Sequence, residues 1–392
     1  MIIIISDVII IGAGASGLVC GLEASKRGRK TIFIDHNNSA GAKLLITGGG
    51  KCNFTNKNIE SHNYISNNPH FVKSALARFT QNDFISIIEK NRIEYEERNL
   101  GQLFLKSSSN QILDLFLNEL KKYKSKFYLN TKIEWVKKTN NDFLVNTNKG
   151  LFKSKSLVVS TGGISFPQTG ASPIGYEIAE KFGINTIKPM PGLVPLTFLP
   201  DDKKKFAHLS GISVNALVKT DKISFKENIL FTHKGLSGPA CLQISLYIKQ
   251  GRPFYIDFLP ENKIENELKN QKTSQKTTKN FISEFLPKNL VEAVFKKNLK
   301  DKKLKSLTDF DIESISDQIH NFKILPAGNL GFTKAEVTIG GVDCNEISSK
   351  TMESLKIKGL FFTGEVLDVT GWLGGYNLQW AWSSGWCAGQ FV

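Results

Sequence analysis

The 392-residue sequence has no long hydrophobic run, no closely paired cysteines and no low-complexity block. Its cysteines stand alone, without a C-x-x-C pair or a ligand-like spacing, which disfavours a disulfide framework and a zinc site. They are Cys20, Cys52, Cys241, Cys344 and Cys387. The apolar opening, residues 1–7, is short, lacks a basic start and runs directly into a glycine-rich motif, so it predicts a buried strand. With no exporting or membrane-spanning segment, we expect a cytoplasmic protein.

The sequence also has too few acidic residues to balance its lysines and arginines, which gives a net charge of +15. Such an excess would attract a phosphate-bearing partner, and the attraction would weaken with salt. The alternative is a solvated lysine-rich surface with no partner. Because single cores stop growing near roughly 250–300 residues, the length predicts two or three subdomains.

A dinucleotide-binding pattern stands near the N-terminus. Val8–Ile11 has the β-branched run of a buried parallel strand, Gly12-Ala-Gly14-Ala-Ser-Gly17 follows, and residues 16–27 have helical periodicity before a second strand, residues 31–35. In this context the glycines allow a tight turn, close approach to a pyrophosphate and close helix–strand contact. Asp35 lies near the distance of about 20 residues at which a carboxylate reaches the ribose.

A second site of the same kind lies near the C-terminus. Residues 359–379 contain a strand, then Asp368, then the Gly374-Gly375 pair that opens a helix. We expect Asp368 to accept from ribose or ribityl hydroxyls and the glycine turn to aim N–H groups at a flavin carbonyl. Two such sites far apart in sequence indicate one long cofactor, and FAD fits. No His or Cys stands in a covalent-linkage context, so we expect it to bind non-covalently.

Further glycine-rich segments complete the predicted site. Residues 43–56 contain three consecutive glycines, which give the clearance that a flat ring system needs, and residues 156–163 read as a buried strand ending in glycines. The predicted FAD contacts are Gly12, Gly14, Ala15, Ser16, Gly17, Asp35, Lys43, Thr47, Gly48, Gly49, Gly50, Lys51, Cys52, Asn53, Thr161, Gly162, Gly364, Asp368, Gly374, Gly375, Tyr376 and Asn377.

Three residues are candidates for catalysis. Cys52 is either a proton donor beside the flavin or a small buried filler. His233, in a turn before a proline-started helix, is either an acid or substrate anchor or a structural hydrogen-bonding residue. Tyr376 follows the C-terminal glycine pair. The sequence contains no metal-ligand pattern.

An inserted domain interrupts the dinucleotide-binding domain. From about residue 190 the pattern changes to strands, at 211–218 and 222–231, followed by a charged helical segment from about 261 to 306. Lysines are concentrated in that segment, at 296–303, which makes it the expected contact surface for a polyanion. No second G-x-G-x-x-G for a separate nicotinamide domain occurs, so a nicotinamide donor would visit the same flavin face as the substrate.

These segments together resemble the FAD-dependent oxidoreductases called BaiN-like, RdsA-like or YhiN-like, related to the two-dinucleotide-binding flavoproteins. The resemblance covers nearly the whole chain and includes residues 12–17, 43–56, 231–239, 340–343 and 364–379. The sequence departs from the family where Ala42 and Lys51 replace common arginines and where Thr370 replaces an acidic residue. Lysine keeps the charge at position 51 but loses the planar fork of arginine.

The resemblance implies an α/β fold in which a Rossmann-like FAD-binding domain is interrupted by an inserted β-barrel domain with a small helical subdomain. The expected parts are 1–189 with 326–392 for the FAD-binding domain, 190–260 with 307–325 for the barrel-like domain, and 261–306 for the small basic helical subdomain.

The activities that the resemblance implies are reduction of an activated C=C bond in a small molecule and reduction of a 23S ribosomal RNA uridine to dihydrouridine. NAD(P)H is the expected transient reductant in both. The positive charge makes us favour RNA. A small-molecule ene-reductase or amine oxidase without an RNA partner is the alternative, and a non-catalytic FAD-containing RNA-binding module ranks last. The sequence leaves the oligomeric state open.

Overall fold

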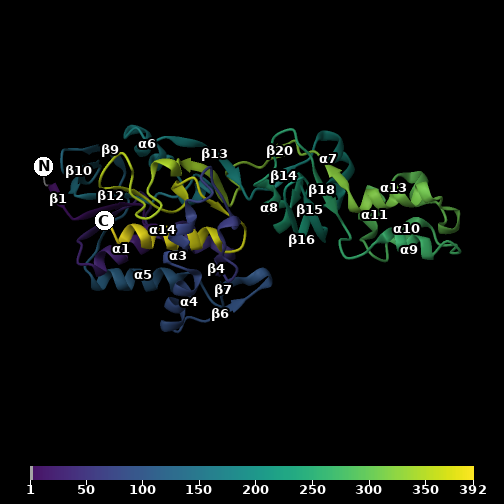
Figure 1. The fold of residues 1–392 in the computed structure, drawn as a ribbon, viewed down its shortest axis with the longest axis horizontal. Helices are drawn as coiled ribbons and strands as arrows, with labels where there is room; N and C mark the ends of the chain where they lie inside the picture. The colour runs from purple at the N-terminus through teal and green to yellow at the C-terminus, as the bar shows by residue number, and fades with distance from the viewer. Residues whose placement is uncertain (1–2) are drawn as a thin grey trace. The chain divides into compact units, whose positions relative to one another are not determined.

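The computed structural model describes residues 3–392 and divides the chain into two compact units (Figure 1). Unit 1 comprises the residues up to Pro191 together with Glu336–Val392, and unit 2 comprises Gly192–Ala335. The chain therefore leaves unit 1, builds unit 2 as one continuous insertion, and returns to complete unit 1.

The core of unit 1 is a five-stranded parallel sheet in the order β22-β12-β2-β3-β8. The strands are β2 (Val8–Ile11), β3 (Thr31–Ile34), β8 (Lys126–Tyr128), β12 (Ser156–Val159) and β22 (Leu360–Phe362). Every residue of β2 and β3 is buried, as the continuous apolar runs predict for strands covered on both faces. The predicted Rossmann-type α/β fold is thereby confirmed.

Two helices from opposite ends of the chain pack together beside this sheet. They are α1 (Ala15–Lys26) and α14 (Tyr376–Gly389), drawn in purple and yellow in Figure 1. A Cβ atom on Gly385 would lie 2.4 Å from the Ser16 carbonyl oxygen, so the two backbones approach as closely as glycine permits.

Residues 3–5 do not form the buried strand that the sequence predicts for the opening segment, of which residues 1 and 2 lie outside the described residues. Strand β1 (Ile3–Ile5) pairs only with β11 (Gly150–Ser154), at the edge of a separate sheet completed by β10 (Phe143–Thr147) and β9 (Ile133–Lys138). Ile5 is 70% exposed there. An edge strand with one face in water leaves apolar side chains exposed, and the buried strand begins only at Val8.

An aromatic cluster anchors α14 to helices between residues 72 and 122. Trp382 is fully buried, stacks on Phe84 with ring centroids 4.5 Å apart, and donates from Nε1 to the Phe54 carbonyl at 2.8 Å. The surrounding elements are α3 (Val72–Arg78), α4 (Gln81–Lys90), α5 (Asn110–Lys122) and the sheet β4 (Asn53–Asn56), β7 (Gln102–Leu105) and β6 (Tyr95–Glu97).

Shorter elements complete unit 1. They are α2 (Ala42–Ile46), β5 (Tyr64–Ile65), α6 (Ile174–Lys181), β13 (Thr186–Gly192), β21 (Val337–Val342) and β23 (Thr370–Gly371).

Unit 2 combines a seven-stranded sheet with a group of short helices. The sheet order is β19-β18-β15-β16-β17-β14-β20, with β14 (Leu196–Thr197), β15 (Ser213–Lys219), β16 (Ser224–Phe231), β17 (Gly235–Ser237), β18 (Phe254–Asp257), β19 (Phe322–Ile324) and β20 (Gly328–Asn329). The helices are α7 (Pro200–Phe206), α8 (Pro239–Ser245), α9 (Ile264–Asn270), α10 (Thr278–Ile282), α11 (Lys288–Val294), α12 (Lys297–Lys300) and α13 (Asp309–His320).

The helical part of unit 2 extends further along the chain than the sequence predicts. Helix α13 lies within residues 307–325, the range expected to belong with the strands, and begins at Thr308, whose hydroxyl accepts from the Asp311 N–H. The Asp311 carboxylate accepts from the Thr308 N–H in return. This reciprocal cap starts a new helix after residue 306.

We predict that Trp382→Ala lowers the free energy of unfolding by about 3–5 kcal/mol, because it removes a fully buried indole from a stacked cluster. Urea unfolding followed by circular dichroism measures the loss. Trp382→Phe keeps the stacking but leaves the Phe54 carbonyl without its donor, so its cost should be about 1–3 kcal/mol. Equal losses for the two variants would contradict the packing role.

Candidate cofactor-binding site

The glycine fingerprint has three geometrically different glycines. Gly12 has a φ of +101°, and a Cβ there would lie 2.4 Å from the Ser160 carbonyl oxygen; a Cβ on Gly17 would lie 2.3 Å from the Gly12 carbonyl oxygen. Gly14, in contrast, has no atom within 4 Å of the position of a Cβ. Gly12 and Gly17 therefore permit the turn and the helix–strand approach. Gly14 faces open space at the N-terminus of α1, where backbone N–H groups favour an anion.

Asp35 lies just after β3 and holds the fingerprint loop. Its Oδ2 accepts from the Ala13 N–H and its Oδ1 from the Asn37 N–H, both at 2.8 Å. The carboxylate thus has a structural function that the sequence did not predict. Each oxygen has a further lone pair, so the predicted contact to a ribose stays a prediction.

The triple-glycine loop is strongly curved. Gly48, Gly49 and Gly50 all have positive φ values, and a Cβ on Gly49 would meet no atom within 4 Å. The Thr47 hydroxyl donates to the Leu44 carbonyl at 2.7 Å, whereas Lys51 is exposed. The backbone at Gly49 is therefore uncovered, and the predicted contact of this loop with a flat ring stays a prediction.

Cys52 ends this loop with its side chain fully buried. Burial raises the pKa of the Cys52 thiol to about 12, with a smaller opposing effect from Thr47. The thiol stays protonated at neutral pH and has no exposed surface for a substrate. Of the two interpretations of Cys52, the geometry favours the buried filler.

Lys43 is held by an acidic residue that the sequence analysis missed. Its Nζ donates to Glu365 Oε2 at 2.7 Å and to the Ser165 hydroxyl at 2.8 Å. Glu365 Oε1 accepts from the Thr338 N–H at 2.8 Å. Glu365 directly follows Gly364 at the carboxyl end of β22, and that Gly-Glu pair after a buried strand was the signal available in the sequence.

Buried polar atoms without partners gather near the carboxyl ends of β12 and β22. Of the five such side-chain atoms among the described residues, three are Thr161 Oγ1, Tyr176 OH and Thr363 Oγ1. Burial raises the pKa of Tyr176, with a smaller contribution from Glu365, so its hydroxyl stays a donor. A Cβ on Gly162, beside Thr161, would meet no atom within 4 Å. Unpaired buried polar groups are costly, so this cluster fits a polar ligand that supplies the missing hydrogen bonds.

The C-terminal glycine turn is clamped against β4. Gly374 and Gly375 have φ values of +110° and +97°, and a Cβ on Gly375 would lie 2.3 Å from the Thr55 carbonyl oxygen. Asn56 donates from Nδ2 to the Gly374 carbonyl at 2.9 Å. In the amide orientation that satisfies its neighbours, Asn53 accepts from the Gly375 N–H at 3.3 Å.

The two residues after the glycine pair have structural environments. Asn377 accepts from the Gly371 N–H at 2.8 Å and donates to the Gly371 carbonyl at 2.9 Å, so its side chain closes the turn. Tyr376 is 7% exposed, and its ring packs edge-on against Tyr64 with centroids 6.2 Å apart.

The structure buries Asp368, and its predicted contact with ribose or ribityl hydroxyls stays a prediction. Its side chain is only 4% exposed, and Oδ2 accepts from the Asn67 N–H at 2.8 Å. Burial raises its pKa, and the hydrogen bond from Asn67 partly offsets this. The carboxylate therefore contacts the loop before α3, whereas Glu365 lies beside Gly163.

His233 belongs to unit 2, in the turn between β16 and β17. Its side chain is exposed, and the turn around it is closed by the Thr232 N–H, which donates to the Gly235 carbonyl at 2.8 Å. The predicted role of His233 as an acid or substrate anchor stays a prediction.

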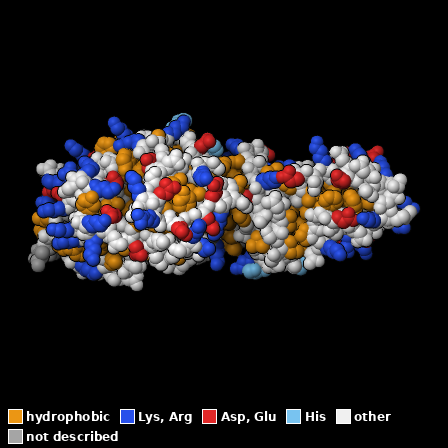
Figure 2. All heavy atoms as spheres, turned by 90° about the horizontal axis from the view of Figure 1, so that it is seen from below, with side chains coloured by type: hydrophobic (Ala, Val, Ile, Leu, Met, Phe, Trp, Pro, Cys, Tyr) orange, Lys and Arg blue, Asp and Glu red, His pale blue; other side chains and the backbone are white. Residues whose placement is uncertain are grey.

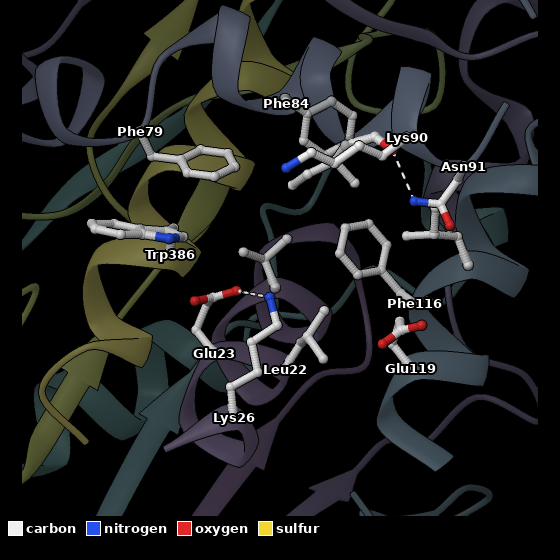
Figure 3. Close-up of a pocket in the computed structure, with 13 residues that line it drawn as sticks. Leu22, Glu23, Lys26, Phe79, Phe84, Lys90, Asn91, Phe116, Glu119 and Trp386 are labelled. Atoms are coloured by element: carbon white, nitrogen blue, oxygen red, sulfur yellow. Dashed lines mark hydrogen bonds and ion pairs between the residues drawn. The ribbon is translucent and has the colours of Figure 1, made fainter. Parts of the chain in front are cut away.

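A cavity of about 330 Å³ lies in unit 1 away from all these residues (Figure 3). Its walls include Phe79, Phe84 and Trp386, and its rim carries the ion pair between Glu23 and Lys26. Helices α1, α4, α5 and α14 supply most of its lining, and it contains none of the predicted contact residues.

Comparison with known proteins places this geometry in a family. The family described as HI0933-like protein Rossmann domain matches residues 6–391. The chain belongs to this family. The resemblance noted in the sequence is thereby confirmed, together with the expected enzyme class, an FAD-dependent oxidoreductase.

Two bacterial relatives match along almost the whole chain. A protein of Escherichia coli K12 named ribosomal RNA dihydrouridine synthase is 45% identical over 98% of this chain and 97% of its own. One of Haemophilus influenzae with the same name is 45% identical over 97% of this chain and 96% of its own. A 3-dehydro-bile acid delta(4,6)-reductase of Clostridium scindens is 29% identical over 97% of both chains.

Solved structures share the fold at low sequence identity. A 3-ketosteroid-delta4-(5alpha)-dehydrogenase of Rhodococcus jostii RHA1 matches with a TM-score of 0.51 and 10% identity over 98% of this chain and 97% of its own. The FrdA quinol fumarate reductase of E. coli also gives 0.51, with 14% identity over 100% of this chain and 70% of its own. Within residues 3–392, no helix has the length and apolar character needed to cross a bilayer.

We predict that Gly14→Ala weakens FAD binding at least tenfold while the apoprotein keeps its thermal unfolding midpoint. An added Cβ at this position meets no protein atom, but it enters the space where a pyrophosphate would approach the helix. Flavin fluorescence titration and thermal unfolding measure the two effects. Gly17→Ala is the matched control, and it should destabilise the apoprotein itself because its Cβ clashes with backbone. Unchanged FAD affinity in Gly14→Ala would refute the assignment.

We predict that all five thiols of the native protein resist Ellman's reagent at pH 8 and react only after unfolding. Each is buried, and burial raises the pKa of every one, to about 11 for Cys387. In the folded protein the pKa of each thiol exceeds the unfolded value of about 8.5. The contribution of the buried neutral thiols to the free energy of unfolding is therefore complete below that pH and falls as the pH rises above it. Rapid native labelling of Cys52 would contradict its assignment as a filler.

Proposed function

We propose that this protein reduces a uridine of 23S ribosomal RNA to dihydrouridine, with NADH or NADPH as the reductant. The observation that carries the proposal is the 45% identity, over nearly the full length, to two relatives named ribosomal RNA dihydrouridine synthase. The relative named for a bile-acid substrate is more distant, at 29%.

In this proposal, unit 1 binds and orients FAD. The N-terminus of α1, with Gly12, Gly14 and Gly17, holds the pyrophosphate, and the uncovered backbone of Gly49 and Gly162 admits the rest of the cofactor. When bound, FAD supplies the two-electron chemistry that reduces an electron-poor C=C bond. The unpaired hydroxyls of Thr161 and Tyr176 support this binding, because a polar ligand would satisfy them.

Glu365, rather than Asp368, is our candidate for contact with the cofactor's hydroxyl groups. Its carboxylate is partly exposed and stands beside Gly163, whose added Cβ would lie 2.9 Å from Glu365 Oε1. Lys43 orients this carboxylate through the 2.7 Å ion pair. Asp368 is engaged by Asn67 and buried.

His233 remains our proposal for an acid or substrate anchor. Reduction of a uracil ring requires a proton in addition to a hydride, and of the three candidates only His233 has an exposed side chain. Cys52 is fully buried and Tyr376 is 7% exposed. We further propose that the inserted residues form a barrel-like sheet with a helical subdomain that selects the substrate, and that the protein acts in the cytoplasm, where ribosomal RNA is found.

A small-molecule reductase is the second candidate, favoured by the relative that acts on a bile acid. It requires the same FAD site and differs only in the substrate. Turnover of a small enone that is insensitive to salt, without retention of RNA, would support it.

We predict that the purified flavoprotein, incubated with NADPH or NADH and ribosomal RNA lacking this modification, adds two mass units at one uridine. Mass spectrometry of nuclease fragments detects and locates the change. Gly14→Ala, assayed at an FAD concentration too low to fill its weakened site, should give no gain and serves as the control. If the flavin bleaches with NAD(P)H while no uridine gains mass, the RNA proposal is wrong and small activated alkenes become the substrates to test.

A further inference from the structure

Basic residues gather at the amino-terminal edge of the parallel sheet in unit 1. The last charged residue before each strand is basic for four of the five strands: Lys30 before β3, Lys124 before β8, Lys155 before β12 and Lys358 before β22. Before β2 it is an acid, Asp7. The glycine fingerprint follows the opposite, carboxyl end of β2. These basic residues and the proposed cofactor site therefore lie at opposite edges of one sheet.

Two basic turns form the centre of this edge. One turn, residues 26–30, joins α1 to β3, and the other, residues 121–126, joins α5 to β8. Three hydroxyls fix the turns side by side: Ser25 lies 2.9 Å from Thr31 and 3.0 Å from Ser125, and Thr31 lies 2.8 Å from Ser125. The lysines are thus displayed on a rigid support.

Most of the charge on these turns is not neutralised. Arg29, Lys30, Lys121, Lys124 and Lys126 are all exposed, and among the ion pairs of residues 3–392 none of them has an acidic partner. We call these five residues the basic edge.

The acids nearest in sequence to the turns are already paired. Glu23 pairs with Lys26 and Glu119 with Lys122, and both acids line the cavity of Figure 3. They therefore lie at the border of the basic edge and do not cancel its charge.

The larger excess of positive charge lies in unit 1, and not in the lysine-rich segment of the insertion where the sequence predicts a polyanion contact. Residues 121–155 contain ten lysines and two acidic residues, a net charge of +8, whereas residues 261–320 contain twelve lysines and ten acidic residues, a net of +2. Within the helical part, Lys302 pairs with Asp311 and Lys276 with Glu284. Figure 2 shows Lys and Arg side chains gathered over the left end of unit 1.

Helix ends alone do not explain this pattern. Cations in the last turn of a helix are stabilised by its dipole, which accounts for Lys26, Lys121 and Lys122. Arg29, Lys30, Lys124 and Lys126 lie beyond those last turns. Four like charges on two clamped turns repel one another, and a polyanion would relieve that repulsion.

We propose that the basic edge binds the phosphate backbone of RNA, away from the reacting base. This inference rests on the proposed ribosomal RNA substrate and adds a second contact at the far edge of the sheet. Phosphate contacts position a nucleic acid without reading its sequence. The basic edge would therefore hold a large structured RNA in place while selectivity comes from the reacting site. A membrane is disfavoured because α1 and α5 bury their apolar faces in the core and offer none to lipid.

The test compares two variants with equal loss of charge. In the first, Arg29, Lys30, Lys124 and Lys126 are all replaced by Gln. In the control, the exposed insertion lysines Lys288, Lys296, Lys297 and Lys305 are replaced by Gln; none of them has an ion pair within residues 3–392. Binding of in vitro transcribed large-subunit ribosomal RNA is measured by filter retention from 50 to 300 mM KCl.

We expect the basic-edge variant to bind at least tenfold more weakly and the slope of log Kd against log salt to fall by about one for each lost phosphate contact. Flavin content and the rate of flavin reduction by NAD(P)H should match the wild type, which shows that the variant is folded. Wild-type binding by the basic-edge variant, or a greater loss in the insertion control, would overturn the inference.

The proposed function fails separately, if wild-type protein retains RNA but forms no dihydrouridine. Retention of phosphatidylserine vesicles in preference to RNA, abolished by the same four substitutions, would also overturn the assignment of RNA as the partner.

Discussion

The contact between α1 and α14 is the constraint on which the rest of unit 1 depends. It is a contact of backbone on backbone: a Cβ on Gly385 would lie 2.4 Å from the Ser16 carbonyl oxygen, and one on Gly389 would lie 2.9 Å from that of Cys20. Only glycine permits this approach. Because α1 begins at the fingerprint and α14 begins at the C-terminal glycine pair, their contact brings the two ends of the chain into one candidate site. The insertion can then be long without disturbing that site.

The regular parts of the fold could be read from the sequence because local pattern and tertiary environment agree there. Val8–Ile11 is continuously apolar and is buried on both faces. At Gly12, Gly14 and Gly17 the local geometry explains why each residue is glycine. Ile3–Ile5 has the same composition but lies at a sheet edge, and composition alone does not distinguish a covered strand from an edge strand. The start of α13 was missed although Thr308 and Asp311 form a reciprocal cap that is visible in the sequence.

The backbone conformation of the candidate site could be predicted from the sequence better than the directions of its side chains. Glycine clearances follow from local turns, whereas the direction of a carboxylate depends on which loop packs over it. Asp368 turns toward Asn67, and Glu365 instead reaches Lys43 and the Thr338 N–H. Charge behaves likewise: the insertion is rich in lysine, but its acids neutralise many of these lysines after folding, and residues 121–155 keep the larger excess.

If FAD satisfies the unpartnered hydroxyls of Thr161, Tyr176 and Thr363, as we propose, the stability of this protein depends on the supply of flavin. A ligand that satisfies them binds only the folded chain, and such a ligand at 100 times its Kd adds about 2.7 kcal/mol to the free energy of unfolding. A cell short of riboflavin would hold more of this chain in the less stable apo form, where proteases act on transiently open molecules. The abundance of the protein, as well as its activity, would then follow the flavin status of the cell.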